Sequence, residues 1–420
     1  AVVDEVLRRL ERDNRVASGA YQPGGHGVEW VDLEVLRRLR RRSLAVLRRE
    51  VEAVETVRLG SFLPAWHQIG NTSPAPVRLP ETIRALQGRA IPASILESDV
   101  LSARMAYNPA DLDLMLASGD LVWVGQGPLG TNDGKLALFY RDHVPLLFDP
   151  PTDELPDGEL HQRVRDHLDE HGASFFNDLY VATGGGTAQP LVDAIWDLVW
   201  AGEVTNDTIG PLRSFVSTKT KMRSTRPNIR LSTPPAASGR WYLVSSLLGD
   251  IGPSPEQRAK ARAEQLLERH GVVTRPAVLS EGLPGGFSGL YPVFGAMEDT
   301  GQLRRGYFIE TLGGAQFGLP GAIDRLRGSA DSGLVLLAAA DPANPYGAAV
   351  PWPDHDAGSP GRHAGAYVVL DDGRLMLFVE RGARSVLSWD SSNAKIAAGL
   401  MEVARHRSSA TTIAKVDGQS

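Results

Sequence analysis

The sequence contains no cysteine among its 420 residues. This absence excludes disulfide bonds and thiolate metal sites, and it fits a reducing, cytoplasmic compartment. No stretch approaches the ~20 consecutive apolar residues that a membrane-spanning helix needs. The first residues alternate charged and apolar side chains, so they do not form a secretory signal. We therefore expect a cytoplasmic protein that does not contact a membrane.

A phosphate-binding loop of the Gly-x-x-x-x-Gly-Lys-Ser/Thr type is also missing. The nearest run, residues 130–136, has the wrong spacing and lacks the hydroxyl group that holds Mg²⁺. Only six lysines accompany the arginines, and the net charge is −6. This balance argues against binding of nucleic acid over the whole surface, so any such surface must be local. We expect no ATPase activity, no cofactor and no metal.

What the chain does contain is a recurring pattern. Apolar residues at three- and four-residue spacing mark one buried helix face, and a short strand-like run follows. The pattern occupies residues 2–16, 111–122, 191–204 and 290–303. In the last three passages a Gly separates helix from strand, where the left-handed conformation ends a helix. This unit is typical of the third helix and wing of a winged-helix domain, and such helices often enter nucleic-acid grooves.

The length predicts three to five modules. From about residue 333 the apolar period becomes strand-like, which indicates a small β-barrel. We expect an α+β fold of tandem winged-helix modules followed by this barrel. The expected units are part of a winged helix with a long Arg-rich helix (1–70), three winged helices (78–150, 153–232 and 254–330), the barrel (333–390), and a helix and strand (391–420) that could belong to a further winged helix.

The Arg-rich helix is predicted over residues 32–51, with Asp32 as its N-cap. Its polar face carries Arg37, Arg38, Arg40, Arg41, Arg42, Arg48 and Arg49. These side chains could bind DNA, but Arg on a helix that also carries Glu is usually solvated or at a subunit contact. Because Ala1 stands in place of an initiator Met, we expect the chain to be a piece of a longer polypeptide.

Several short runs together carry a family resemblance. They are Glu29-Trp30-Val31-Asp32, Leu36-Arg37-Arg38-Leu39-Arg40-Arg41-Arg42-Ser43, Phe62-Leu63-Pro64-Ala65-Trp66, Asp197-Leu198-Val199-Trp200-Ala201-Gly202-Glu203-Val204-Thr205-Asn206-Asp207-Thr208, Gly239-Arg240-Trp241, Gly313-Gly314-Ala315-Gln316-Phe317-Gly318 and Asp341-Pro342-Ala343-Asn344-Pro345-Tyr346-Gly347. In this order the chain resembles the C-terminal region of the bacterial Lhr (large helicase-related) family of superfamily 2 DNA helicases. The resemblance extends over essentially the whole sequence.

This resemblance implies tandem winged helices and a β-barrel placed C-terminal to a helicase motor, with an architecture related to AlkZ-type DNA glycosylases. It implies three partners. One is the N-terminal helicase core of the same polypeptide, and the whole protein would be an ATP-dependent 3′–5′ helicase. The second is single-stranded DNA or an RNA:DNA hybrid, and the third is further copies of the chain in a homo-oligomer, expected to be a tetramer. It also implies a nucleoid-associated location and, in some members, uracil excision from DNA.

Excision of a base needs a positioned water and stabilisation of an oxocarbenium-like transition state, and a carboxylate can supply both. The AlkZ-type motif, Gln–apolar–Asp/Gln, is matched best by Gln68-Ile69-Gly70 and Gln316-Phe317-Gly318, and both carry Gly in its last place. Candidate catalytic carboxylates are Asp341, at a strand end before Pro342, and Asp417, in a Val-Asp-Gly turn. An Asp in such a place more often caps a turn.

Two segments are candidates for nucleic-acid binding. The first is a basic run with interleaved hydroxyl residues, Lys219, Lys221, Arg223, Arg226 and Arg230, which could contact phosphates or form a solvated loop. The second consists of Arg304, Arg305, Tyr307 and Gln316. These side chains could contact phosphates and stack on bases. Alternatively, they could form an ordinary wing strand and a packed turn.

The remaining patterns favour structure over chemistry. His167 and His171 lie four residues apart on one predicted helix with His161, but no third metal ligand recurs nearby. Trp196 and Trp200, also four apart, favour core or subunit packing. We expect a non-catalytic module of a DNA-repair helicase that provides oligomerisation and nucleic-acid binding. The alternatives are a monofunctional uracil-type DNA glycosylase and a purely structural oligomerisation domain.

Overall fold

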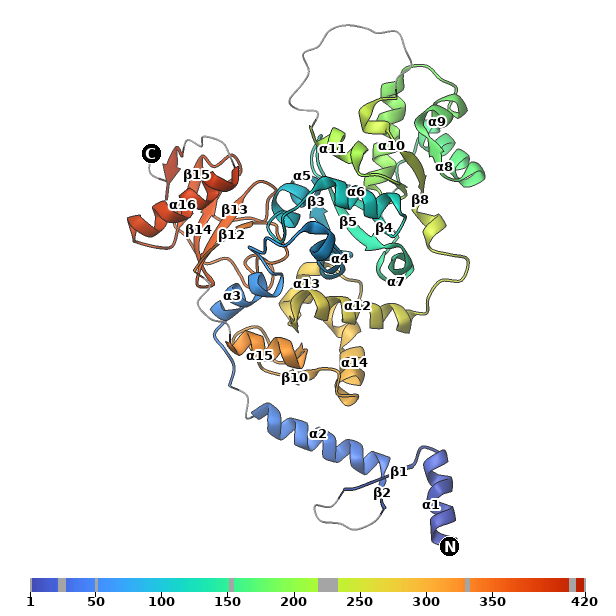
Figure 1. Ribbon diagram of the computed structural model, residues 1–420, viewed down its shortest axis with the longest axis vertical. Helices are drawn as coiled ribbons and strands as arrows, with labels where there is room; N and C mark the ends of the chain where they lie inside the picture. The colour runs from blue at the N-terminus through green and yellow to red at the C-terminus, as the bar shows by residue number, and fades with distance from the viewer. Residues whose placement is uncertain are drawn as a thin grey trace.

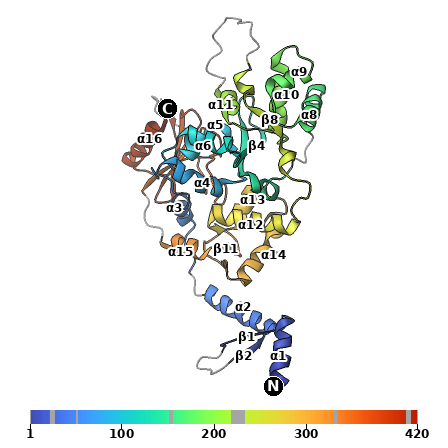
Figure 2. The same ribbon diagram turned by 45° about the vertical axis from the view of Figure 1, so that its right-hand side comes forward.

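The structure is a computed structural model that describes residues 2–21, 28–49, 52–150, 155–217, 233–328, 333–407 and 413–418. Small α+β units follow one another along the chain (Figure 1). The helices α1 (Val2–Arg12) and α2 (Leu33–Arg49) lie at one end of the long axis, and the turned view in Figure 2 gives the same order. Among the described residues, no helix is long and apolar enough to cross a bilayer.

The N-terminal unit contains a two-stranded antiparallel sheet between its helices. Strand β1 (Val16–Gly19) pairs with β2 (Glu29–Asp32). Asp32 caps α2 as expected, because its Oδ1 accepts the N–H groups of Glu34 at 2.7 Å and Val35 at 3.2 Å. Val35 and Leu39 on the first turns of α2 are about half exposed, so part of the predicted apolar face is uncovered in the single chain.

Three later units share one topology that the sequence pattern predicts only in part. In each, a helix is followed by a two-residue strand, two more helices and a pair of wing strands. The antiparallel sheets run in the orders β3-β5-β4, β6-β8-β7 and β9-β11-β10, so the last wing strand always lies in the middle. This repeated arrangement is the winged-helix fold, which confirms the α+β winged-helix prediction.

The helices and strands of the three units have the following bounds. In the second unit they are α3 (Val57–Trp66), α4 (Ala75–Leu86), β3 (Ile91–Pro92), α5 (Ala93–Ile95), the π-helix η1 (Leu96–Leu101), α6 (Pro109–Ala117), β4 (Leu121–Pro128), β5 (Gly134–Tyr140), η2 (Arg141–His143) and α7 (Val144–Leu147). In the third they are α8 (Glu159–His171), β6 (Ser174–Phe175), α9 (Phe176–Ala182), α10 (Ala188–Trp200), β7 (Val204–Asn206), α11 (Gly210–Ser217), η3 (Pro235–Ala237), β8 (Arg240–Leu243) and η4 (Val244–Leu247). In the fourth they are α12 (Pro255–His270), β9 (Val272–Val273), α13 (Arg275–Glu281), α14 (Gly286–Asp299), β10 (Arg304–Gly306), β11 (Gln316–Gly318) and α15 (Pro320–Gly328).

The glycines that end the third helix of each unit have the predicted left-handed conformation. Gly119, Gly202 and Gly301 have φ values of 81°, 77° and 77°. In the N-terminal unit Asn14 takes the same place with φ 54°, and Asn tolerates this region better than most residues do. The turn that separates helix from wing is therefore built alike in all four passages.

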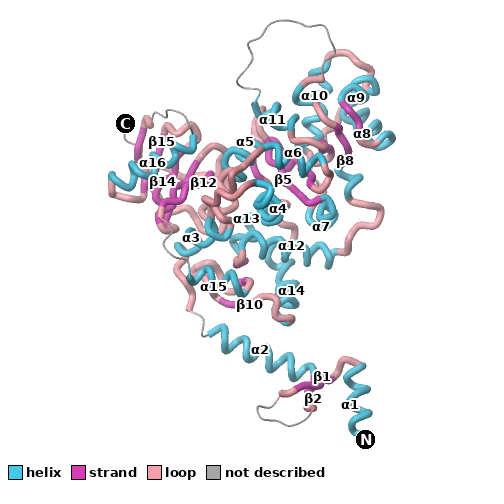
Figure 3. The backbone as a smooth tube through the Cα atoms, in the orientation of Figure 1, coloured by secondary structure: helices cyan, strands magenta, loops and turns pink. Residues whose placement is uncertain are grey.

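The C-terminal part is an open sheet, and the prediction of a closed β-barrel is wrong. Its five strands run in the order β12-β13-β14-β15-β16, and no pairing joins β12 to β16. Their bounds are β12 (Leu334–Ala338), β13 (Tyr367–Asp371), β14 (Arg374–Val379), β15 (Ser385–Ser388) and β16 (Lys415–Val416). Helix α16 (Asn393–Arg407) packs across β12 and β14, and Figure 3 shows it beside these strands. Because the helix covers one sheet face, the strands need not close on themselves.

Buried polar groups join the second unit, the fourth unit and the C-terminal sheet. The buried carboxylate of Glu281 on α13 pairs with Arg269, with Arg89 at 3.6 Å and with His270 at 2.9 Å. Arg269 in turn donates to the Ala85 and Gln87 carbonyl groups at the C-terminal end of α4. Helix α3 packs against α15 and β14, so segments far apart in sequence meet at the centre of the molecule.

Candidate active site and nucleic-acid surface

Asp417, one of the two candidate carboxylates, follows β16 at the edge of the C-terminal sheet. Strand β16 pairs in parallel with β15, and the Asp417 N–H donates to the Val386 carbonyl at 2.9 Å. Its backbone lies in the left-handed region, at φ 52°, which is uncommon for a residue other than Gly. The strand pairing therefore holds this side chain in one place on the sheet.

A histidine and a backbone amide orient the Asp417 carboxylate. Its Oδ1 accepts the Ser388 N–H at 2.7 Å and lies 3.2 Å from Nε2 of His355. The Ala357 N–H donates to Nδ1 of His355 at 3.1 Å, so Nε2 carries a proton, which the Ser388 carbonyl accepts at 3.1 Å. The Asp417 side chain is 40% exposed. Among the described residues, its Oδ2 has no hydrogen-bond partner.

An aromatic ring lies against the same histidine. The ring of Trp389 meets that of His355 edge to face at 5.0 Å, and its Nε1 donates to the Asp354 carbonyl at 3.0 Å. Trp389 is partly exposed. A half-exposed carboxylate with one free oxygen thus lies close to a fixed aromatic surface. His355, Ser388 and Trp389 were not predicted, because nothing in their sequence spacing connects them to Asp417.

Asp341, the second candidate carboxylate, lies in the interior. Arg104 binds both of its carboxylate oxygens, at 2.7 and 2.8 Å, and each side chain is at most 1% exposed. Oδ1 also accepts the Ala343 N–H at 2.7 Å. This is the turn-capping arrangement that the sequence left open as the alternative, and it leaves no carboxylate oxygen at the surface.

Gln316 is also buried, and its amide group is fully used. Its Oε1 accepts the N–H groups of Phe308 and Ile309 at 3.0 and 2.9 Å, while Nε2 donates to the Ile309 carbonyl at 2.7 Å. The side chain holds the segment between β10 and β11 in place. No polar atom of Gln316 is therefore directed to the surface.

The other predicted nucleic-acid contacts of the fourth unit lie at the surface. Arg304 and Tyr307 are exposed, while Arg305 is partly buried and donates to the Tyr291 hydroxyl at 2.9 Å. The Arg305 guanidinium also lies 3.2 Å from the buried Glu298 carboxylate. Arg304 and Arg305 form the wing strand β10. The basic run Lys219, Lys221, Arg223, Arg226 and Arg230 lies outside the described residues.

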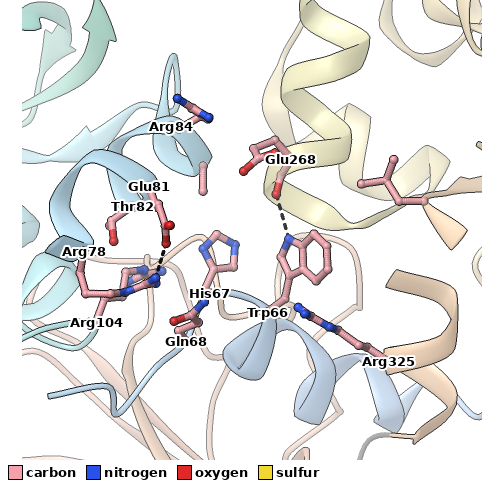
Figure 4. A pocket seen from close by; sticks show the side chains of 12 residues that line it. Trp66, His67, Gln68, Arg78, Glu81, Thr82, Arg84, Arg104, Glu268 and Arg325 are labelled. Carbon is pink, nitrogen blue, oxygen red and sulfur yellow. Dashed lines mark hydrogen bonds and ion pairs between the residues drawn. The ribbon is translucent and has the colours of Figure 1, made fainter. Parts of the chain in front are cut away.

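Gln68, from the first match to the glycosylase motif, lines a cavity of about 330 Å³. The cavity lies between the C-terminal ends of α3 and α12, helix α4 and helix α15 (Figure 4). Gln68 is exposed and has φ 55°, and Gly70 has φ 84° with open space around its Cα. A side chain at Gly70 would meet no atom within 4 Å, but it would be strained in this left-handed conformation, so the carboxylate or amide of the motif is absent from this place.

His67 lies within the wall of this cavity and is 5% exposed. Burial, together with the positive charge of Arg104, lowers the pKa of His67 well below its usual value. The ring is therefore neutral near pH 7. Trp66 forms the adjoining wall, because its Nε1 donates to the Glu268 carbonyl at 2.8 Å and the Arg325 guanidinium lies over its ring at 5.5 Å.

The three histidines on α8 make hydrogen bonds and a ring contact. His161 lies 3.1 Å from the Asp197 carboxylate, His167 bonds Ser174, and the His167 and His171 rings stack at 4.5 Å. Within the described ranges, no three side chains of metal-binding type come together. Trp196 lies in the core among Trp123, Phe215 and Trp241, which is the packing role expected of it.

Known proteins resemble this chain in sequence and in fold. Residues 54–141 and 252–334 each match the family described as large helicase-related protein, winged-helix domain. The Mycolicibacterium smegmatis protein named Lhr helicase/probable uracil glycosylase is 43% identical over 95% of the chain. The Escherichia coli protein named Lhr helicase/uracil glycosylase is 34% identical over 94% of it. The chain spans 28% of the length of each of these relatives.

The fold is also that of a solved glycosylase. Streptomyces sahachiroi DNA glycosylase AlkZ matches with a TM-score of 0.51 and 16% identity, over 87% of this chain and all of that one. At this identity the likeness concerns the fold alone. The two winged-helix matches and the relatives that align along nearly the whole sequence show that the chain is the C-terminal winged-helix region of the Lhr, or large helicase-related, family.

Proposed function

We propose that this chain is the DNA-glycosylase region of a large helicase-related protein and that it removes uracil from DNA. Two relatives that align along nearly its whole length have uracil glycosylase in their names. The observation that carries the proposal within this chain is the Asp417 carboxylate, which is 40% exposed, accepts the Ser388 N–H, lies beside His355, and has no partner at Oδ2 among the described residues.

The proposed reaction is hydrolysis of the bond between deoxyribose C1′ and uracil N1. The oxygen of a water molecule bonds to C1′ as the C1′–N1 bond breaks, and the electron pair of that bond leaves with the base. Oδ2 of Asp417 stabilises the positive charge that develops on the sugar and takes the proton from the water. That proton then neutralises the departing uracil anion, so Asp417 returns to its ionised state.

The surroundings of Asp417 suit this role. The Ser388 N–H binds Oδ1, and Nε2 of His355 lies 3.2 Å from the same oxygen, so Oδ2 is the oxygen left for the substrate. A target base must leave the helical stack before a side chain can reach its glycosidic bond. The partly exposed ring of Trp389 offers an aromatic face or edge for such a base.

We also propose that the region binds nucleic acid and assembles with other chains. Single-stranded DNA or an RNA:DNA hybrid would contact Arg304 and Tyr307 on the wing of the fourth unit, with the basic run from Lys219 to Arg230. The partly exposed Val35 and Leu39 on α2 support an apolar contact with a second copy, and a homotetramer is the expected assembly. The N-terminal helicase core would be the remaining partner.

A uracil-excision assay separates the glycosylase from a purely non-catalytic module. A single-stranded oligonucleotide with one dU is incubated with the chain and then treated with alkali, which breaks the strand wherever a base is missing. The proposal expects breaks at dU and none when dT or dC replaces it. Absence of breaks at dU under conditions where the chain binds the oligonucleotide would leave only the binding and assembly function.

A further inference from the structure

The third helices of the later units are unsuited to hold a nucleic-acid backbone. In a winged-helix domain this helix commonly enters the groove of a duplex. Helices α6, α10 and α14 take this place in the second, third and fourth units, and none of them contains a lysine, an arginine or a histidine. Each contains two acidic residues instead. Because these charges repel phosphates, we expect the backbone contacts elsewhere.

Positive charge is concentrated on α2 of the N-terminal unit. This helix contains seven arginines and one acidic residue, Glu34, so it has a net charge of +6 in a chain whose net charge is −6. The side chains of Arg37, Arg40, Arg41 and Arg42 are exposed. The helix thus has the opposite charge to the third helices of the later units.

The arginines of α2 form rows along the helix. Residues four positions apart lie on the same helix face, about 6 Å apart along the axis. Arg37 and Arg41 form one row, and Arg38 and Arg42 form the neighbouring row. Like charges at this spacing destabilise a helix, so an anionic ligand bound along the rows would relieve the repulsion.

Little in the described part of the chain neutralises these rows. Arg38 pairs with Glu34 at 2.6 Å, and within the described ranges no ion pair reaches Arg37, Arg41 or Arg42. In Figures 1 and 2, α2 lies at one end of the molecule, apart from α16 and the C-terminus. The rows are therefore accessible to a long ligand and lie apart from the sheet that carries Asp417.

The shape and charge of the rows favour nucleic acid over protein as the partner. A nucleic-acid strand presents regularly repeated negative charges, and a guanidinium group can bind a phosphate with two hydrogen bonds. A symmetric contact between two copies through this same face would place arginine against arginine. The rows therefore fit a phosphate backbone better than a second copy of the chain.

We propose that the exposed arginine rows of α2 bind the sugar–phosphate backbone of single-stranded nucleic acid, independently of base sequence. This surface rests on the proposed nucleic-acid binding and deepens it. Phosphate contacts position a protein on a strand and carry no sequence information. Helix α2 would thus hold the strand, while Asp417 acts on one nucleotide at the C-terminal sheet.

The salt dependence of binding tests this surface. Labelled oligo(dT) is titrated with the chain at several salt concentrations, and binding is followed by fluorescence anisotropy. Each phosphate contact on a single strand contributes about 0.7 to the slope of log K against log [salt]. Arg37→Gln combined with Arg41→Gln should therefore reduce the slope by about 1.4 and weaken binding roughly 10- to 30-fold at about 0.1 M salt. The loss should be equal on oligo(dA).

Two further variants assign the effect to the charge on α2. Arg37→Lys combined with Arg41→Lys keeps both charges and should retain most of the wild-type slope. Lys260→Gln combined with Arg327→Gln removes two exposed charges from α12 and α15, and this matched control should bind as the wild-type chain does. Melting curves verify folding, and light scattering should show the wild-type oligomeric state for every variant.

An unchanged slope in the glutamine variant of α2 would overturn the inference, and so would an equal loss in the control. A shift in the oligomeric state of the glutamine variant would make the rows a contact between proteins and would also overturn it. Excision of uracil is measured separately on the unsubstituted chain. Excision with an unchanged slope in the α2 variant contradicts only the arginine rows, and lack of excision with a reduced slope contradicts only the glycosylase proposal.

Discussion

Arg104 and Asp341 form a fully buried ion pair between the second unit and the C-terminal sheet. Removing one partner of such a pair leaves an uncompensated charge in the interior. We expect Arg104→Met to lower the free energy of unfolding by about 3–5 kcal/mol, measured by urea denaturation. The exposed pair Arg38–Glu34 provides the control, since Arg38→Met should change it by less than about 0.5 kcal/mol. A loss below ~1 kcal/mol for Arg104→Met would show that the pair is not essential.

The sequence identified single residues but not their environments. Asp341 and Asp417 were both candidates on the same grounds, a carboxylate at a strand end or turn. Only the tertiary structure separates them, because Arg104 lies 237 positions from Asp341 and His355 reaches Asp417 from another segment. Likewise, nothing in the sequence marks His67 as a buried ring in the wall of a cavity.

At the scale of elements, α3 approaches the C-terminal sheet backbone to backbone. A Cβ at Gly60 on α3 would overlap the carbonyl oxygen of Gly373, in the turn between β13 and β14. We expect Gly60→Ala to cost about 1–3 kcal/mol and to lower the melting temperature of the chain. This contact requires glycine for its size rather than for its backbone conformation.

A second helical glycine gives the matched control. Gly295 lies within α14, and a Cβ there would meet no atom within 4 Å. Gly295→Ala should therefore stabilise the chain by about 0.5–1 kcal/mol, because alanine favours the helix. If both substitutions shifted the melting temperature in the same direction, the close packing of α3 on the sheet would not be the cause.

Helices were predicted better than strands, for a physical reason. The apolar periodicity of α6, α10 and α14 and the glycine that ends each helix are local features that span a few residues, so they can be recognised in the sequence alone. The strands β3, β6 and β9 are only two residues long and have no period to detect. The barrel was predicted wrongly because closure depends on which edge strands meet, and α16 covers the sheet instead. The division of the chain into domains stays a prediction.

At the scale of the whole molecule, buried titratable groups join the units and make stability depend on pH. Burial lowers the pKa of His67 and of His270. Burial alone would raise the pKa of Glu281, but Arg269 and Arg89 outweigh it and hold this pKa well below its usual value. All three groups therefore bind fewer protons in the folded chain than in the unfolded one.

Stability should consequently fall as the pH is lowered. The histidines stabilise fully above their unfolded pKa of about 6.5 and lose this contribution below it, and Glu281 adds a further loss below about 4.5. Melting temperatures measured from pH 8 to pH 5 should decline, and His67→Phe should flatten the decline while the exposed control His171→Phe should not. A melting temperature independent of pH across this range would contradict the assignment.

The central claim is that Asp417 performs the chemistry of the region. The most direct measurement is the single-turnover rate of uracil excision by Asp417→Asn, with Asp324→Asn at an exposed position on α15 as the matched control. A positioned acid–base group typically contributes 10²–10⁴-fold to the rate. We therefore predict that Asp417→Asn lowers the excision rate by at least about a hundredfold, with oligonucleotide binding and melting temperature unchanged. The control should excise uracil at the wild-type rate. Excision at the wild-type rate by Asp417→Asn would contradict the account.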